Sequence, residues 1–282
     1  MMFTDQLIDQ MQATLQSPGR VAVRTSHLAE KIVFVDGMPG CGKTMLSPIV
    51  AALPRIELLQ YAYEIEYVCS LHYLKRIESD AATTLVRMLT DLQLYNVMMA
   101  RETNFRLGDL SSVLIDARPF RYFRRLFQAG DAAVLERIHS ESPILHLTTH
   151  NLLGYSAPVF EALSERVLFI EVVRHPLYMI RQHKMNTDRY GIDVRDFTIW
   201  YKWNQTSLPY FAAGWEDLYL NSNPIDRAIY SFWNWNRQID ILKQSRLDEW
   251  QKYVIIVPFE RFVLDPQPYM KQIESALGTQ AD

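Results

Sequence analysis

The sequence predicts an α/β protein with a doubly wound, mostly parallel sheet and flanking helices. Three observations predict this fold class. Short apolar runs rich in β-branched residues recur along the chain, helical patterns separate them, and the first run leads through a glycine-rich turn into a helix. Strands that alternate with helices form a parallel sheet, because each helix carries the chain back across a face of the sheet.

The elements follow in order. The first 16 residues have the pattern of an amphipathic helix, and KIVFVDG is an apolar run typical of a strand buried on both faces. The apolar run RVLFIEVV is too short to span a membrane and predicts a buried strand. Strands are expected at 31–37, 111–117, 143–149, 166–173 and 253–260, and helices at 44–53, 83–101 and 120–137.

One segment, 189–250, breaks this alternation and predicts a helical, aromatic-rich insertion or lid within a single domain that spans 1–282. The segment contains all six tryptophans of the chain. These side chains either form the core of the insertion or line a pocket for an acceptor molecule. They are Trp200, Trp203, Trp215, Trp233, Trp235 and Trp250.

Composition limits the classes of function. The chain has 282 residues, 49% of them hydrophobic, and a formal net charge of −3. This charge predicts no general attraction to nucleic acid, and we expect no membrane span. Two cysteines, Cys41 and Cys69, do not make a disulfide framework, which favours a cytoplasmic location. The oligomeric state stays open.

The turn after the first predicted strand matches the P-loop pattern G-x-x-x-x-G-K-[ST] in full. Its glycines allow a tight turn in which successive amides point at one phosphate, and the following helix adds the positive end of its dipole. We expect Lys43 to reach the terminal phosphates and the Thr44 hydroxyl to bind Mg²⁺. The predicted nucleotide-binding residues are Gly37, Met38, Pro39, Gly40, Cys41, Gly42, Lys43 and Thr44.

A P-loop site needs a carboxylate at a neighbouring strand end, and Asp116 after SSVLI is the best candidate to hold Mg²⁺ with Thr44. Asp116 is equally well explained as the cap of the following helix. Glu171, Glu57 and Glu64 are weaker alternatives for the acidic role. The arginines that follow Asp116 either face the same crevice or form a solvated basic surface; they are Arg118, Arg121, Arg124 and Arg125.

Two further candidates end predicted strands. His150 follows PILHLTT and is a candidate general base, and Arg174 follows VLFIEVV and is placed to contact phosphate. Arg181, Arg189 and Arg195 lie further along and are candidates for a closing lid.

Beyond the P-loop NTPase superfamily, several segments together resemble the sulfotransferase family. MPGCGKTML resembles its phosphosulfate-binding loop, ILHLTTHNL its strand with the catalytic histidine, and RVLFIEVVRHPLYMIRQ the strand that binds the donor's 3′-phosphate. YVIIVPFERFVLDPQPYMKQI is similar to the closing strand of that family. The resemblance implies that His150 acts as the base and Arg174 contacts the 3′-phosphate.

The chain also departs from that family. The family's loop lysine falls on Gly40 and its loop threonine on Lys43, and the serine that partners the 3′-phosphate arginine falls on Gln182. The lysine before the histidine falls on Thr148. The donor loop is therefore that of a P-loop kinase, with Lys43 and Thr44 arranged for Mg²⁺ and a nucleoside triphosphate.

These patterns predict an ATP- and Mg²⁺-dependent phosphotransferase that acts on a hydroxyl of a small molecule or glycan. Its catalytic residues are expected to be Lys43, Asp116, His150 and Arg174. The first alternative is a sulfotransferase that uses 3′-phosphoadenosine 5′-phosphosulfate. The second is a nucleotide-driven switch or assembly protein whose aromatic segment binds another protein.

Overall fold

A five-stranded parallel sheet forms the centre of the computed structural model, which describes residues 19–279. The strand order is β2-β3-β1-β4-β7, and each neighbouring pair is parallel. The predicted fold class is confirmed, whereas the helix predicted over the first 16 residues lies outside the described part. The strands are β1 Lys31–Asp36, β2 Gln60–Tyr61, β3 Ile144–Thr148, β4 Val167–Val173 and β7 Val254–Pro258.

The register of the sheet defines two edges. Lys31, the first residue of β1, pairs with Ile144 at the start of β3, and Asp36 at the end of β1 pairs with Glu171 of β4. The amino ends of these strands therefore share one edge and the carboxyl ends share the other. Every residue of β3 is buried, as expected for a strand with helices on both faces.

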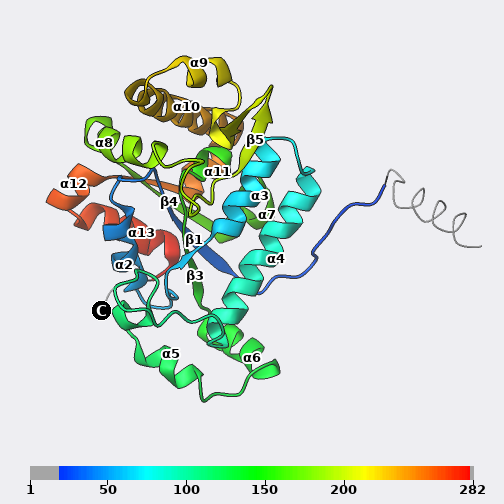
Figure 1. Ribbon diagram of the computed structural model, residues 1–282. Helices are drawn as coiled ribbons and strands as arrows, with labels where there is room; N and C mark the ends of the chain where they lie inside the picture. The colour runs from blue at the N-terminus through cyan, green and yellow to red at the C-terminus, as the bar shows by residue number, and fades with distance from the viewer. Residues whose placement is uncertain (1–18, 280–282) are drawn as a thin grey trace, which may run out of the picture.

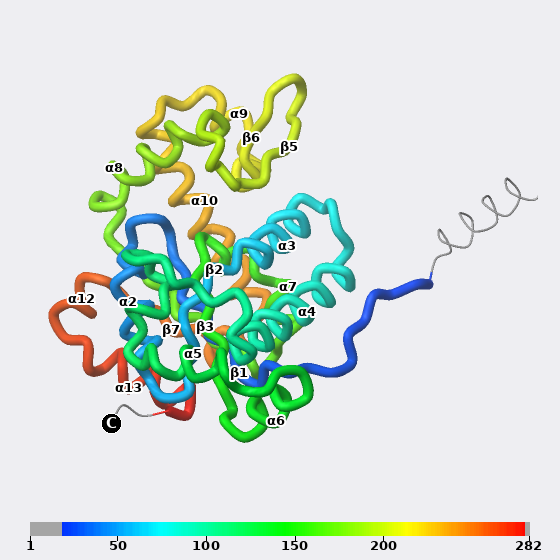
Figure 2. The backbone as a smooth tube through the Cα atoms, turned by 60° about the horizontal axis from the view of Figure 1, so that its bottom comes forward, coloured from blue at the N-terminus to red at the C-terminus, as the bar shows by residue number. Residues whose placement is uncertain are grey.

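Helices cover both faces of the sheet (Figure 1; Figure 2 shows the same division after rotation). Phe34 of β1 stacks on Phe169 of β4 with 4.9 Å between ring centroids, and Phe160 of α7 lies 5.4 Å from Phe169. One side carries α2 Lys43–Ala51, α12 Phe259–Leu264 and α13 Gln267–Leu277; the other carries α3 Tyr63–Tyr73, α4 Ser79–Met98 and α7 Ala157–Leu163.

The strand predicted at 111–117 is wrong, because this segment forms a 3-10 helix at Val113–Ile115. The Ser112 hydroxyl accepts a hydrogen bond from the Leu114 amide and starts that turn. Of the apolar residues 113–115, only Val113 is buried, while Leu114 and Ile115 are 44% and 45% exposed. The apolar run resembles a strand in composition, but it packs only one side chain into the protein.

The helix predicted at 120–137 is divided into α5 Phe120–Arg125 and α6 Ala132–Glu141. Gly130 precedes the break at Asp131, whose φ of 48° is incompatible with a continuous helix. Both helices lie below the sheet in Figure 1, on the side of the strands' amino ends.

The aromatic-rich segment lies above the sheet in Figure 1, at the strands' carboxyl ends. It is mainly helical, and it also contains an antiparallel hairpin that the sequence did not reveal. Asn223 caps its longest helix by accepting hydrogen bonds from the Ile225 and Asp226 amides. The segment contains β5 Trp200–Trp203, β6 Thr206–Pro209, α9 Glu216–Asn221, α10 Pro224–Ser245 and the start of α11 Leu247–Tyr253, and α8 Pro176–Thr187 precedes it.

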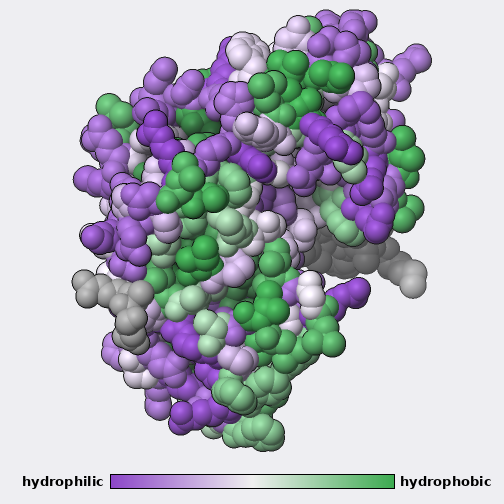
Figure 3. Space-filling view, turned by 90° about the vertical axis from the view of Figure 1, so that its left-hand side faces the viewer, coloured by the Kyte–Doolittle hydropathy of each residue, from purple (hydrophilic) through white to green (hydrophobic). Residues whose placement is uncertain are grey.

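The surface is mixed in character. In Figure 3 apolar side chains gather through the middle of the side that carries α2, α12 and α13, and hydrophilic side chains surround them. Met45, Ile49 and Leu264 are among the exposed apolar residues of these helices. Within residues 19–279, no helix combines the length and the hydropathy that crossing a bilayer requires.

Candidate functional site

The loop 37–42 connects β1 to α2 and has the geometry of an anion cradle. Gly37, Gly40 and Gly42 have φ angles of 142°, 90° and 105°, which residues other than glycine rarely adopt. A Cβ atom at Gly42 would lie 2.1 Å from Cδ2 of Phe259. The Cys41 amide bonds to the Met38 carbonyl. The loop is therefore tightly closed on itself.

Several amides of this loop are free to bind a ligand. Among the described residues, no acceptor takes the amide hydrogens of Gly40, Gly42 or Thr44, whereas the Lys43 amide bonds to the Cys41 sulfur. Lys43 and Thr44 are the first residues of α2, so the helix has no internal partner for their amides. A phosphate group fits such a cluster of donors at a helix N-terminus.

Lys43 itself is buried and not at the surface of the crevice. Its ammonium group donates to the Gly37 carbonyl oxygen at 2.7 Å, and the residue is 5% exposed. Below it lie the adjacent acids Asp36 and Glu171, both fully buried. Lys43 therefore binds the first residue of the loop, and its positive charge acts on the acidic side chains beneath the loop.

These two acids differ in their surroundings. Asp36 accepts hydrogen bonds from the Thr149 hydroxyl and the Leu153 amide, at 2.9 and 2.7 Å. Glu171 has no hydrogen-bond partner among the described residues. Burial, reinforced by the negative charge of Asp36, raises the pKa of Glu171 well above its ordinary value, although Lys43 opposes the shift. Glu171 therefore keeps its proton at pH values at which an ordinary glutamate has lost it, and a protonated carboxyl group is a poor metal ligand.

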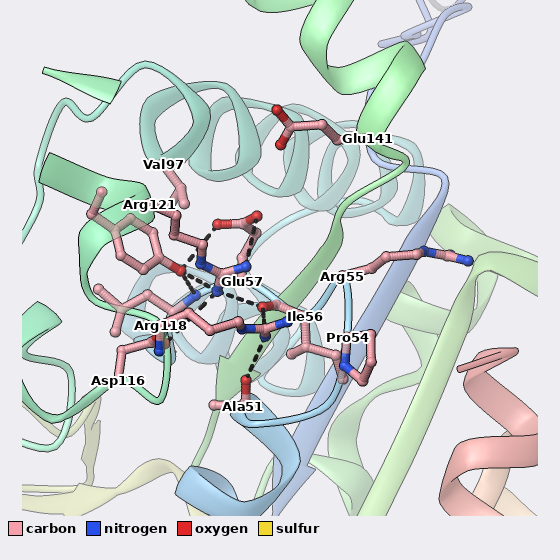
Figure 4. A network of polar contacts seen from close by, with 12 residues as sticks. Ala51, Pro54, Arg55, Ile56, Glu57, Val97, Asp116, Arg118, Arg121 and Glu141 are labelled. Carbon is pink, nitrogen blue, oxygen red and sulfur yellow. Dashed lines mark hydrogen bonds and ion pairs between the residues drawn. The ribbon is translucent and has the colours of Figure 1, made fainter. Parts of the chain in front are cut away.

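Thr44 is exposed in the first turn of α2, but its predicted metal partner is elsewhere. Asp116 accepts from the Arg118 amide at 2.7 Å and lies 3.7 Å from Arg121. Arg121 in turn donates to the carbonyl of Ile56, beside the first residue of β3. Figure 4 shows Asp116 in this cluster.

The position of Asp116 excludes its predicted role at the loop. The cluster sits at the amino edge of the sheet, about 13 Å of strand length from the carboxyl edge, given about 3.3 Å per residue over β3. Asp116 instead closes a turn by accepting from the Arg118 amide, and it does not cap α5, whose N-cap is Pro119. No group of three or more His, Cys, Asp or Glu suited to a metal occurs in 19–279. Asp116 and Thr44 therefore do not meet in the structure, and Asp116 is not the carboxylate that would share a Mg²⁺ ion with Thr44.

His150 lies directly after β3 and is held in place by α3. Its amide donates to Glu66 Oε1 at 2.8 Å, and its Nδ1 lies 3.2 Å from the same oxygen. The rings of Tyr61 and Tyr63 lie nearly parallel to the imidazole, with centroids 6.2 and 5.9 Å away. This arrangement leaves Nε2 as the ring nitrogen available to an acceptor.

Glu66 was not predicted, because the sequence revealed neither α3 nor its contact with β3. The neighbouring candidate Glu64 is exposed on the same helix, and Glu57 belongs to the cluster at the opposite edge. In the sequence, Glu66 could have been noticed only because it stands two residues after Glu64, on the other side of the apolar residue Ile65, which is buried in the structure.

A cavity of about 400 Å³ joins His150 to the loop. Pro39 of the loop and His150 both line it, together with Glu66. Arg189 and Arg195 also line it, whereas Arg181 is exposed on α8. None of the tryptophans is among its lining residues; its aromatic walls are Tyr63, Tyr67, Tyr190, Phe197, Tyr210 and Phe211.

Arg174 reaches the loop from the end of β4. Its Nη1 donates to the Gly40 carbonyl at 3.1 Å, and its guanidinium lies 4.6 Å from the ring centroid of Phe259. Gln182 of α8 approaches the same glycine, since a Cβ at Gly40 would lie 2.9 Å from its Oε1. Phe259, which starts α12, was not predicted as a site residue. The structure thus brings Arg174, Gln182 and the loop together.

The arginines that follow Asp116 do not face this crevice. They belong to α5 and its preceding turn, at the amino edge of the sheet, where Arg118 donates to the carbonyls of Ala51, Leu53 and Ile56. The prediction that they reach the nucleotide site is wrong, because the segment 111–117 forms no strand that would lead them to the carboxyl edge.

No family model matches the chain, and no curated protein sequence matches it. Two solved structures are similar in fold. One is a sulfotransferase domain from the olefin synthase of Synechococcus PCC 7002, with 16% identity and a TM-score of 0.46 over 94% of this chain and 78% of that one. The other is a sulfotransferase from Alicyclobacillus acidocaldarius, with 14% identity and a TM-score of 0.41 over 90% and 83%.

Proposed function

We propose that the chain is a nucleotide-dependent transferase that moves a sulfuryl group from 3′-phosphoadenosine 5′-phosphosulfate to a hydroxyl group. One observation carries the proposal: His150, oriented by Glu66, opens into the same cavity as Pro39 of the anion-binding loop. A base and a phosphate cradle that share a cavity suit group transfer to an acceptor held between them.

In this proposal each residue has a defined role. The free amides of the loop hold the 5′-phosphate of the donor, and Lys43 keeps the loop in shape through its hydrogen bond to the Gly37 carbonyl. His150 takes the proton of the acceptor hydroxyl, whose oxygen attacks sulfur while the bond between sulfur and the phosphate oxygen breaks. Adenosine 3′,5′-bisphosphate leaves, and the loop amides stabilise the charge that develops on its phosphate. Arg174 and Gln182 occupy the sequence positions to which the family resemblance assigns contacts with the 3′-phosphate, and both approach Gly40 of the loop.

A phosphotransferase that uses ATP is the second candidate, and the residues Lys43 and Thr44 favour it because they complete the P-loop pattern. Two observations place it second. Asp116, its predicted metal ligand, lies at the opposite edge of the sheet, and Glu171 is buried with a raised pKa.

Calorimetric titrations distinguish the two candidates. We expect adenosine 3′,5′-bisphosphate to bind at least about ten-fold more tightly than ATP with Mg²⁺, and EDTA to leave that affinity unchanged. Lys43→Ala should weaken both ligands, with circular dichroism as a control for folding. Tighter binding of ATP that depends on Mg²⁺ would reverse the ranking and favour the phosphotransferase.

A further inference from the structure

A second cavity, of about 600 Å³, lies at the amino edge of the sheet. Its floor is near the start of β3, where the Glu57 amide donates to the Ile144 carbonyl. It is thus separated from the P-loop by the length of the sheet. Its lining residues are Arg55, Glu57, Phe120, Arg121, Arg124, Arg125, Gln128, Glu141 and Pro143.

A buried ion pair forms the base of this cavity. Both guanidinium nitrogens of Arg125 donate to Glu57, at 2.7 and 2.9 Å, and the Tyr122 hydroxyl donates to Glu57 at 3.1 Å. Glu57 and Arg125 are 1% and 5% exposed. In Figure 4, Arg121 and Arg118 point toward Glu57 and Ile56. The paired side chains hold the neighbouring arginines in fixed positions before any ligand arrives.

The cavity carries a surplus of positive charge. Its lining contains four arginines and two glutamates, which gives a formal charge of +2. Arg118 and Asp116 lie behind it and cancel each other. This local charge contrasts with the net charge of −3 of the whole chain, so the cavity attracts anions although the chain as a whole is acidic.

Two of the arginines have donors to spare, since within residues 19–279 Arg55 uses only its Nε, which donates to the Ser142 carbonyl, and Arg124 uses none. Within the described part of the chain, no side chain or carbonyl pairs with the guanidinium of Arg124, which is exposed at the cavity. Arg125 also contacts Glu141 at 3.2 Å, and the Glu141 side chain is 48% exposed. A solvated carboxylate of this kind contributes little and is readily displaced by a stronger anion.

We propose that this cavity binds a small organic phosphate monoester. A phosphate monoester carries about −1.5 to −2 charges at neutral pH, which matches the surplus of +2, and arginine donors suit its planar pairs of oxygens. The cavity exceeds the size of a bare phosphate, and the ring of Phe120, 82% exposed, offers a surface for the organic part. The site is independent of the proposed transfer reaction.

Phenyl phosphate is a suitable probe, with inorganic phosphate for comparison at constant ionic strength. Hydrogen exchange of the α5 amides reports on this site separately from the loop 37–42. We expect phenyl phosphate to slow hydrogen exchange in α5. Arg124→Gln should weaken the affinity for phenyl phosphate, measured from this protection, about ten-fold. Glu141→Gln should tighten binding about two- to five-fold, because it removes the competing carboxylate.

Arg76→Gln is the matched control, since Arg76 is exposed at the end of α3 and its side chain has no partner among the described residues. Its affinity should equal that of the wild type. If Arg76→Gln and Arg124→Gln weakened binding equally, the loss would reflect only the change in net charge of the protein, and the proposal would be overturned. Protection confined to the loop 37–42, or equal affinity for inorganic phosphate, would overturn it as well.

Discussion

Nδ1 of His150 lies 3.2 Å from Oε1 of Glu66, which also accepts the hydrogen bond of the His150 amide. One carboxylate oxygen thus fixes both the backbone and the ring of the histidine. A helix that follows β2 supplies the carboxylate, and the end of β3 supplies the histidine. The pair joins two elements that are 84 residues apart in the chain.

The first prediction concerns this pair. Under the proposed function, His150→Ala should lower turnover of the sulfate donor by about 10²- to 10⁴-fold, because a general base is lost. Glu66→Gln should lower it by about ten- to a hundred-fold, the value of a charge-assisted hydrogen bond.

Glu64→Gln is the control for Glu66→Gln, because Glu64 is exposed on the same helix and bonds to no described residue. Its turnover and pH profile should match the wild type. If Glu64→Gln and Glu66→Gln behaved alike, the contact between Glu66 and His150 would have no part in catalysis.

The second prediction concerns Arg174, whose Nη1 lies at the Gly40 carbonyl. Arg174→Ala should weaken adenosine 3′,5′-bisphosphate about ten- to a hundred-fold and ATP little, because ATP has no 3′-phosphate. Calorimetry with both nucleotides measures the difference. Arg181→Ala, at an exposed position of α8, should change neither affinity. Equal losses for the two nucleotides would contradict the assignment of Arg174 to the 3′-phosphate.

The third prediction concerns the packing of Phe259 on Gly42. A Cβ at Gly42 would lie 2.1 and 2.2 Å from two ring carbons of Phe259, and the φ of 105° adds backbone strain. Gly108 has a φ of 76° with nothing within 4 Å of its Cβ position. Gly108→Ala should therefore cost about 1–2 kcal/mol of unfolding free energy from strain alone.

Gly42→Ala should cost about 1–3 kcal/mol more, because the ring must move. Urea denaturation of both variants measures the difference. Adding Phe259→Ala to Gly42→Ala should relieve the steric part, and the double-mutant cycle would show it as a coupling energy. If Gly42→Ala and Gly108→Ala lowered the unfolding free energy equally, the Phe259 ring would move aside without an energetic cost.

The fourth prediction compares two buried glutamates. Burial, with the charge of Asp36, raises the pKa of Glu171, so its folded form retains a proton that the unfolded form has lost. Stability therefore falls as pH rises from the ordinary value of 4.5 toward the folded pKa. Glu171→Gln should remove this loss and raise the unfolding free energy at neutral pH.

The pKa of Glu57 is shifted in the opposite direction. Hydrogen bonds from Arg125 outweigh the effect of burial and lower its pKa, so its stabilisation is present above the ordinary value of 4.5 and is lost as pH falls through the folded pKa. Glu57→Gln should cost about 3–5 kcal/mol at neutral pH, because Arg125 is left buried without its partner. Chemical denaturation across pH measures both variants, and a stabilising Glu57→Gln would refute this account.

Much of the fold was readable in the sequence. Strands buried on both faces are continuous apolar runs, so β1, β3, β4 and β7 were predicted within a few residues, and so was their alternation with helices. The P-loop pattern was found because it is a local signal, in which a strand, a turn and a helix follow one another along the chain. For the same reason His150 and Arg174 were placed correctly at strand ends.

The tertiary structure decided which of the predicted residues meet. SSVLI has the composition of a strand, but Val113 is the one apolar side chain that it buries and the segment forms a 3-10 helix. Asp116 and the arginines after it therefore lie at the amino edge of the sheet. Glu66 became the partner of His150, and Phe259 covered Gly42, through contacts between segments far apart in the chain. Hydropathy patterns record how deeply a residue is buried, whereas the sheet order and register determine which side chains become neighbours across it.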